Sequence, residues 1–324
     1  MKKFIHGLWV IGLMALTSVT QAQNSAWPLK PIRLVVTFPP GGSSDAAARI
    51  VAPRLAERLG QAVVVDNRPG AGGAVGLDLV AKSAPDGYTI VLASAGGLTA
   101  NPSLYKQLPY EPLRDFAPIT LFGTSPFILL AHPTLPVSSI GDVLKMAKTQ
   151  PGRLSYASGG NGTAMHLSGE LLKSMGRVSI VHIPYRGSGP AVMAVMSGET
   201  QLAVADITTV LPQLKSGRVK VLGVMGKERS PLAPELPTLN ESGLQGYDAS
   251  GWFAVLAPAA TPSSIVQRLN ADITAVLRSA EIRERFFAAG LEPLPSSSDE
   301  LAVLMKAETL KWGRVIKESG AQVD

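Results

Sequence analysis

The chain has 324 residues, of which 46% are hydrophobic and 17% charged, and it contains no cysteine. The apolar content is sufficient for a large buried core, and the lack of cysteine excludes a disulfide framework and thiol chemistry. The formal net charge of +6 comes from scattered lysine and arginine residues without a basic run. A nucleic-acid partner is therefore not expected.

Residues 1–22 have the pattern of a secretory signal peptide. Lys2 and Lys3 precede an apolar segment at 8–16, and the small-residue motif Thr20-Gln21-Ala22 follows it. The apolar segment is too short to span a membrane, so an N-terminal membrane anchor is the less favoured alternative. We expect cleavage after residue 22, a mature net charge of +4, and a periplasmic location.

The stretch 33–60 predicts a buried strand, a glycine turn and the start of a helix. The apolar run Leu34–Phe38 ends at Pro39-Pro40-Gly41-Gly42. Three candidate capping residues follow, namely Ser43, Ser44 and Asp45. The free N–H groups and the dipole of a first helical turn favour an anion. Because 46–48 are alanines, where a phosphate loop needs Gly-Lys-Ser/Thr, a carboxylate is favoured over a nucleotide.

Apolar strands and amphipathic helices alternate through the rest of the chain. We expect further strands at 62–67, 88–93, 127–131, 154–157, 179–184, 201–205, 219–224 and 252–256. We expect helices at 74–83, 139–149, 164–176 and 208–216, and from 188, from 262, at 281–289 and at 299–318. This alternation predicts an α/β protein with parallel sheets covered on both faces.

A second strand, glycine loop and helix occupy 154–176, with the loop at Ser158–Gly162 and Thr163 as the helix cap. We expect the two glycine loops to face each other across one cleft. Roughly 300 mature residues favour two lobes. A helical C-terminus that returns to the first lobe divides the chain into lobe 1 (23–124 plus 248–324) and lobe 2 (125–247). Clefts of this kind close by hinge motion.

These motifs resemble the solute-binding proteins of tripartite tricarboxylate transporters, also called the Bug family. The matching stretches are KPIRLVVTFPPGGSSDAAAR, VVVDNRPGAGGAVG, PDGYTIVLAS, NPSLYKQLPYEPLRDFAPI, LSYASGGNGTAMHLSGELLK, HIPYRGSGPA, GWFAVLAPAATP and the late Trp312. Each stretch alone is unspecific, but together they cover nearly the whole mature chain in order. The resemblance implies a two-lobed periplasmic binding protein, type II-like, each lobe a sheet flanked by helices. It also implies a small organic acid or amino acid ligand, delivery to membrane permease subunits, and neither metal nor cofactor. We expect a monomer.

The resemblance also implies which residues surround the ligand. They are Phe38, Gly41, Gly42, Ser43 and Asp45 in the first loop, Asn161, Gly162, Thr163 and His166 in the second, and Ser94 and Asp206 as walls. The chain departs from the family pattern where Thr37 precedes Phe38, since proline is common there, and where Ile207 follows Asp206, since members vary there. Both departures leave the identity of the ligand open.

Several residues have a second interpretation that the sequence leaves open. The loop glycines satisfy a tight turn as well as an anion site. Asp45 is a helix cap, or it contacts an amine or hydroxyl of the ligand through a water. His166 donates to a carboxylate, or it pairs with Glu170 on the surface. Arg186 is an exposed turn residue or a charge partner, and Trp252 is packing or a stacking platform.

Two other functions compete with solute capture. An exported hydrolase is disfavoured because the sequence has no G-x-S-x-G elbow and no H-E-x-x-H metal motif. A sensor that presents its closed form to a signalling receptor fits the same residues. The sequence does not separate sensing from uptake.

Overall fold

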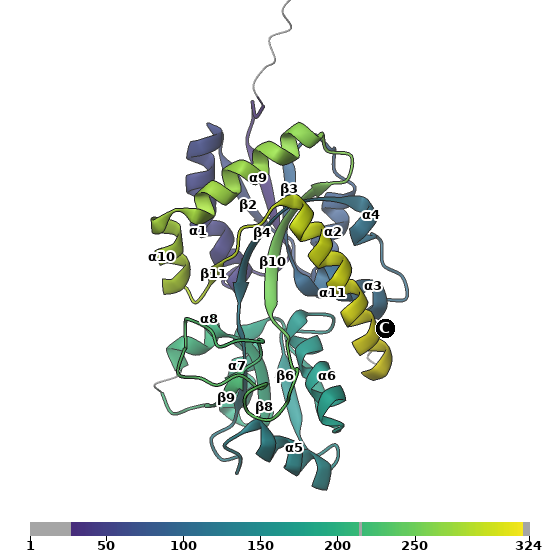
Figure 1. The fold of residues 1–324 in the computed structure, drawn as a ribbon, viewed down its shortest axis with the longest axis vertical. Coiled ribbons are helices and arrows are strands. Elements are labelled where there is room, and N and C mark those ends of the chain that lie inside the picture. Colours follow the sequence, from purple (N-terminus) through teal and green to yellow (C-terminus); the bar gives the residue numbers. More distant parts are fainter. Residues whose placement is uncertain (1–26, 214–215, 320–324) are drawn as a thin grey trace, which may run out of the picture.

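The computed structural model describes residues 27–213 and 216–319, so the predicted signal peptide lies outside the described residues. The chain forms two lobes stacked along the long axis of the molecule, each a β-sheet flanked by helices (Figure 1). This confirms the predicted fold class. No helix in the described ranges is long and apolar enough to cross a membrane.

The first sheet has six strands in the order β11-β4-β10-β3-β1-β2. Their bounds are β1 Ile32–Val36, β2 Val63–Asn67, β3 Thr89–Ser94, β4 Phe116–Ser125, β10 Gly251–Pro258 and β11 Glu292–Pro293. Strand β1 pairs in parallel with β2 and β3, whereas β10 is antiparallel to β3 and β4, and β11 is antiparallel to β4. The sheet is therefore mixed, and the prediction of parallel sheets was wrong for this half.

Helices cover both faces of the first sheet because side chains alternate along its buried strands. Leu34 and Val36 of β1 pack with α1 (Ser43–Leu59), α9 (Ser263–Arg278) and α10 (Ala280–Ala288). Val35 packs on the opposite face with α2 (Ala74–Ala81) and the start of α11 (Ser298–Ser319). Short turns η1 (Ala71–Gly73), η2 (Gly96–Ala100), α3 (Asn101–Leu104) and α4 (Pro112–Asp115) complete this lobe.

The second sheet has five strands in the order β7-β6-β8-β5-β9. Their bounds are β5 Phe127–Ala131, β6 Ser155–Ser158, β7 Val181–Pro184, β8 Leu202–Asp206 and β9 Lys220–Val224. Strand β5 is antiparallel to β8 and β9, so this sheet is mixed as well. The reversed strands are β10 and β11 in the first sheet and β5 in the second, and of these β5 and β10 each follow a crossing between the lobes.

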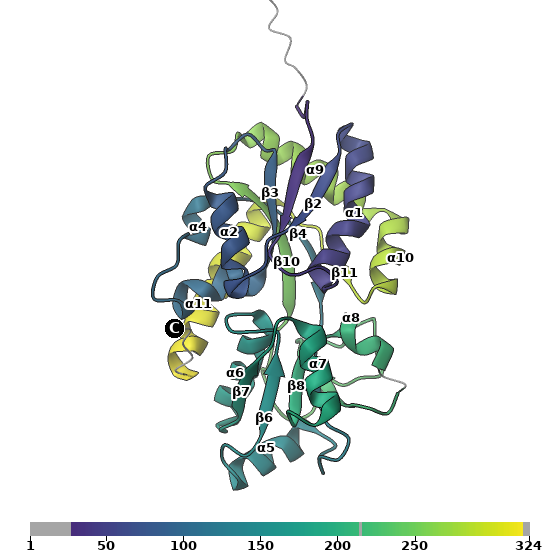
Figure 2. The same cartoon turned by 180° about the vertical axis from the view of Figure 1, so that it is seen from behind.

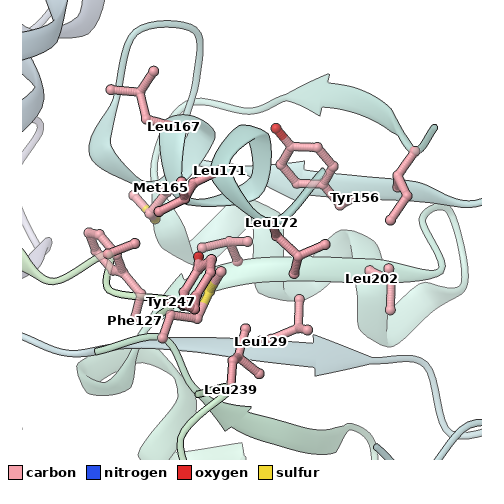
Figure 3. Packing of buried hydrophobic residues seen from close by; sticks show 14 of the residues in the cluster. Phe127, Leu129, Tyr156, Met165, Leu167, Leu171, Leu172, Leu202, Leu239 and Tyr247 are labelled. Atoms are coloured by element: carbon pink, nitrogen blue, oxygen red, sulfur yellow. The ribbon is translucent and has the colours of Figure 1, made fainter. Parts of the chain in front are cut away.

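Two helical layers enclose the second sheet. Helices α5 (Ile140–Thr149) and α6 (Ala164–Gly176) pack on Leu129 and Leu202. Figure 3 shows Leu171 and Leu172 of α6 together with these two residues at close range. Helices α7 (Ser188–Ser197) and α8 (Ile207–Val210), followed by the turn η3 (Leu211–Gln213), lie against the other face. Tyr247, from the irregular segment after β9, completes the core near α6 by donating a hydrogen bond of 2.7 Å to the carbonyl of Ser168.

The chain crosses between the two sheets twice. Pro126 alone separates β4 from β5, and the segment before β10 returns to the first sheet. The last turns of α11 also reach the second lobe, where Trp312, Val315 and Ile316 share a buried cluster with side chains of α6. Both views show the C-terminal part of α11 beside α6 (Figures 1 and 2). Trp312 also shares this cluster with Ala100 and Leu104 of the first lobe, so the late part of α11 contacts both lobes, and the residue bounds of the two lobes stay a prediction.

Two details of the strand and helix prediction need correction. Strand β4 was not predicted, because Pro118 and the run Gly123-Thr124-Ser125 are unusual inside a strand. Proline is tolerated because β11 pairs only with Gly123 and Thr124, which leaves the Pro118 side of β4 at the sheet edge. A proline at position 53 is expected to kink or shorten the helix that begins near Ser43, but α1 continues past Pro53 to Leu59 and is not shortened.

Candidate functional site

A pocket of about 210 Å³ lies between the two lobes, and both sheets contribute to its walls. Its apolar lining includes Phe38 from the loop after β1, Phe127 from β5, Met165 from α6, and Trp252 and Phe253 from β10. A second, more open pocket of about 810 Å³ adjoins it. The two pockets share Phe38, Pro39, Thr163, Arg186 and Gly187. Together they form one interlobe cleft.

Three helices begin at the wall of the smaller pocket. They are α1, with Gly42 as N-cap, α6, with Thr163 as N-cap, and α7, with Gly187 as N-cap. Neither Gly42 nor Gly187 has a side chain to cap its helix, and Thr163 accepts only from the N–H of His166. The first-turn N–H groups are thus available to a ligand, and three positive dipole ends meet at one place. This arrangement suits an anion.

Asp45 shapes the first glycine loop from the side away from the pocket. Its carboxylate accepts hydrogen bonds from the N–H of Gly41 at 2.9 Å, from Arg49 Nε at 2.9 Å and from Asn67 Nδ2 at 3.0 Å. Burial raises the pKa of Asp45, but these hydrogen bonds outweigh it and hold the pKa below the ordinary value of 3.8. Asn67 Nδ2 also donates to the carbonyl of Phe38 at 3.0 Å. Asp45 is therefore ionised, and its hydrogen bonds hold the first glycine loop in its conformation beside the pocket.

His166 has the same role in the second glycine loop. The N–H of Gly162 donates to His166 Nδ1 at 3.3 Å, and His166 Nε2 lies 3.8 Å from Glu170 Oε1. The side chain of His166 is 6% exposed. The alternative of a surface pair with Glu170 therefore named the right partner, but the pair is buried and does not lie on the surface. Since Nδ1 accepts a hydrogen bond, the ring proton resides on Nε2. This fixes the conformation of the loop before α6.

The ring of His166 stacks on that of His182, with centroids 4.0 Å apart, and His182 Nε2 lies 2.6 Å from Ser158 Oγ. Burial lowers the pKa of His166 to about 4, although Glu170 opposes this. Burial, and then the neighbouring His166, lower the pKa of His182 to about 3. Both rings are neutral in the folded protein near pH 7, so the pair acts through packing and hydrogen bonding.

Acid is therefore expected to destabilise this pair. Below pH 6.5 the unfolded chain protonates both histidines while the folded chain does not, so stability falls until the folded pKa values are reached. Between pH 7 and pH 5 we expect each histidine to account for a loss of about 1–2 kcal/mol. The His182→Gln variant should lose less unfolding free energy over this range than the wild type in urea titrations. His132→Gln, outside the pair, is the control, and an equal loss in both variants would contradict the assignment.

Two polar side-chain atoms in the small pocket have no hydrogen-bond partner among the described residues. They are Ser94 Oγ and Trp252 Nε1, on side chains that are 7% and 5% exposed. Both atoms are themselves inaccessible to solvent, although buried polar groups normally have a partner. Trp252 also belongs to the buried cluster that includes side chains of α2 and α11, which agrees with its interpretation as packing.

The structure places the predicted site residues in three groups. Phe38, Gly41, Gly42, Ser43, Ser94, Thr163 and Asp206 line the small pocket. Asn161 lines only the adjoining pocket. Asp45, Gly162 and His166 line neither and instead hold the two loops in shape. Contact of each residue with a ligand remains a prediction.

The start of α7 was missing from the predicted site. Arg186, Gly187 and Ser188 all line the small pocket, and Arg186 is exposed and lines the adjoining one too. The sequence contains a signal for this, because the predicted strand at 179–184 and the segment YRGSGP repeat the order of strand, glycine and helix start for a third time. A single arginine in a turn is usually exposed and solvated, so the sequence alone leaves open whether Arg186 is an exposed turn residue or a charge partner.

Comparison with known proteins agrees with this geometry. The family model described as "Tripartite tricarboxylate transporter family receptor" matches residues 47–321. Protein BugT of Bordetella pertussis is 38% identical over 98% of both chains. The solved structure of Rhodopseudomonas palustris Rpa4515 with adipate has a TM-score of 0.85 at 35% identity, covering 91% of this chain and 98% of the other. That of the periplasmic binding protein BugD has a TM-score of 0.83 at 34% identity, covering 91% and 99%. The chain belongs to the tripartite tricarboxylate transporter receptor family, the Bug-type periplasmic solute-binding proteins, as its motifs indicated.

Proposed function

We propose that this protein captures a small carboxylate in its interlobe cleft and delivers it to the permease subunits of a tripartite transporter. The observation that carries the proposal is the meeting of three uncapped or partly capped helix starts, from α1, α6 and α7, on one buried and mostly apolar pocket. Backbone N–H groups at helix starts bind a carboxylate without a dedicated cation. The adipate bound by the related Rpa4515 is consistent with this ligand class.

Binding is coupled to closure because the two loops belong to different lobes. We take lobe 1 as residues 23–124 plus 248–324 and lobe 2 as 125–247, which follows the two sheets and their crossings closely. A ligand that contacts both lobes binds the closed form better than the open form and shifts the population toward it. The closed surface is then what a membrane partner recognises.

The protein acts by non-covalent capture. This agrees with its family, whose members are binding proteins and not hydrolases. Delivery to a permease is favoured over signalling because the matching family model is that of a transporter receptor. The signal peptide pattern at 1–22 and the periplasmic relative BugD support a periplasmic location for the mature protein.

A thermal-shift screen of the mature protein tests the ligand class. A carboxylate present at about 100 times its Kd stabilises the folded state by roughly 2.7 kcal/mol, which should raise the Tm by several degrees. We expect such a shift from at least one small carboxylate and none from the matching neutral diamide. Extraction and mass spectrometry beforehand control for a co-purified ligand. If no carboxylate shifts the Tm of ligand-free protein, the proposed function is wrong.

A further inference from the structure

The small pocket contains a carboxylate of the protein itself. Asp206 ends β8, is 5% exposed and lines the pocket. Its neighbours include the hydroxyls of Ser43 at the start of α1, Ser188 at the start of α7 and Ser125 at the end of β4. Asp206 of the second lobe therefore lies at the starts of two of the three helices that favour an anion. Asp206 therefore adds one negative charge of the protein beside these two helix starts.

No buried cation balances a second negative charge at this position. Of the described residues that line the small pocket, only Asp206 and Arg186 carry charged side chains, and Arg186 is exposed at the rim shared with the adjoining pocket. The elements around Asp206, namely the starts of α1 and α7, the end of β4 and β10, present serine, glycine and aromatic residues. A ligand carboxylate next to Asp206 would therefore meet an unscreened like charge.

A hydrogen-bond donor on the ligand would fit the same place. The Asp206 carboxylate is an acceptor on the second-lobe side of the pocket, and Ser94, at the end of β3, lines the same pocket from the first lobe. An amide, hydroxyl or ammonium group can satisfy a buried acceptor, whereas a second carboxylate cannot. The carboxylate that the protein does bind is left to the first-turn N–H groups of α6 and of the glycine loop before α1.

We propose that Asp206 is the specificity-determining residue of this pocket, which selects a monocarboxylate whose far end carries an N–H or O–H donor and rejects a dicarboxylate. This inference rests on the proposed function, since it assigns the two ends of a captured carboxylate.

The pH dependence of the charge on Asp206 offers a second, independent test of this role. Burial raises the pKa of Asp206 to about 6, and the neighbouring Ser43, Ser188 and Ser125 only partly oppose this. The group is ionised at pH 7.5 and largely protonated below pH 6. Once protonated, it can donate a hydrogen bond to a ligand carboxylate.

Isothermal titration calorimetry with three matched pairs of probes tests the proposal. Each pair consists of a diacid and its monoamide: succinate with succinamate, adipate with adipamate, and terephthalate with 4-carbamoylbenzoate. At pH 7.5 we expect the monoamide of the best-fitting pair to bind about tenfold tighter than its diacid, or more. In Asp206→Asn this preference should shrink by about tenfold, because asparagine donates to the diacid. Ser94→Ala, which changes an uncharged residue of the same pocket, should keep the preference.

A second measurement keeps the test independent of how well the variant folds. In the wild-type protein, the preference within the aromatic pair should narrow between pH 7.5 and pH 5.5, because free benzoic acid groups are still mostly ionised at pH 5.5 whereas Asp206 is mostly protonated. A diacid that binds tighter than its monoamide at pH 7.5, or a preference unchanged in Asp206→Asn and at pH 5.5, would overturn the inference alone. Failure of all six probes to bind ligand-free wild-type protein would overturn carboxylate capture, and the inference with it.

Discussion

Replacement of Gly42 by glutamate is expected to abolish carboxylate binding while the protein remains folded. Gly42 is the N-cap of α1 with φ −84° and ψ 173°, a conformation that any residue adopts, and a Cβ at this position would lie 3.7 Å from its nearest neighbour, the carbonyl oxygen of Pro39. The backbone therefore accepts a side chain. A glutamate at the start of α1 interacts favourably with the helix dipole, so no loss of stability is expected.

The loss of binding follows from where this side chain lies. Gly42 lines the small pocket, so the glutamate places its own carboxylate among the N–H groups that the ligand needs. We expect an affinity at least about 100-fold weaker by calorimetry, a change of about 2.7 kcal/mol. Gly42→Ala should bind within a few-fold of wild type, and Gly42→Gln, of equal size but neutral, should fall between the two. Wild-type affinity in Gly42→Glu would show that the pocket is not the ligand site.

Much of the fold was predictable because local patterns and tertiary packing agree. Strand β5 coincides with the predicted strand at 127–131, and its alternating residues pack on opposite faces, Leu129 toward α6 and Ile128 toward α7. The direction of the strands was not predictable in the same way. An apolar strand buried on both faces looks the same in parallel and antiparallel sheets, and only the chain path through Pro126 makes β5 antiparallel to its neighbours.

The site was predictable where backbone geometry creates it and less so where side chains turn away from it. The glycine loops at 39–42 and 158–162 were identified from strand, glycine and helix order, and both border the cleft. The orientation of Asp45 and His166 depends on partners distant in sequence or across a turn, such as Asn67 for Asp45. Helical spacing reveals Arg49 as a partner of Asp45 and Glu170 as a partner of His166, but not the contacts with Asn67 and with the N–H of Gly162. Both residues were therefore assigned to the ligand, although their polar atoms hold the loops in shape.

The second large effect is expected from Gly96→Ala, which should weaken ligand binding by interfering with the approach of the lobes. Gly96 starts η2 in the first lobe, and a Cβ on it would lie 2.8 Å from both the N of Ala164 and the carbonyl oxygen of Gly162 in the second lobe. These are backbone atoms of the second glycine loop and the first turn of α6. The clash can be relieved only by a shift of η2 or of that loop.

Either shift separates the α6 start from the rest of the pocket, because Thr163 and Ala164 line it. We expect an affinity lowered by about tenfold or more, and a more open average shape in small-angle X-ray scattering with saturating ligand, since the strain falls on the closed form. The fold itself should persist, because alanine suits a helical turn better than glycine.

Gly97→Ala is the matched control for this prediction. A Cβ on Gly97 would also meet an atom at 2.8 Å, but that atom is Cδ1 of Leu77, the end of a side chain within the first lobe. This contact can be relieved by a rotamer change of Leu77 in the core of the first lobe, without movement between the lobes. The substitution should therefore lower the Tm and leave the affinity nearly unchanged. If both variants lose stability equally and neither loses affinity, the contact at Gly96 does not control closure. An affinity loss confined to Gly96→Ala would locate the closing contact at η2 and the second glycine loop.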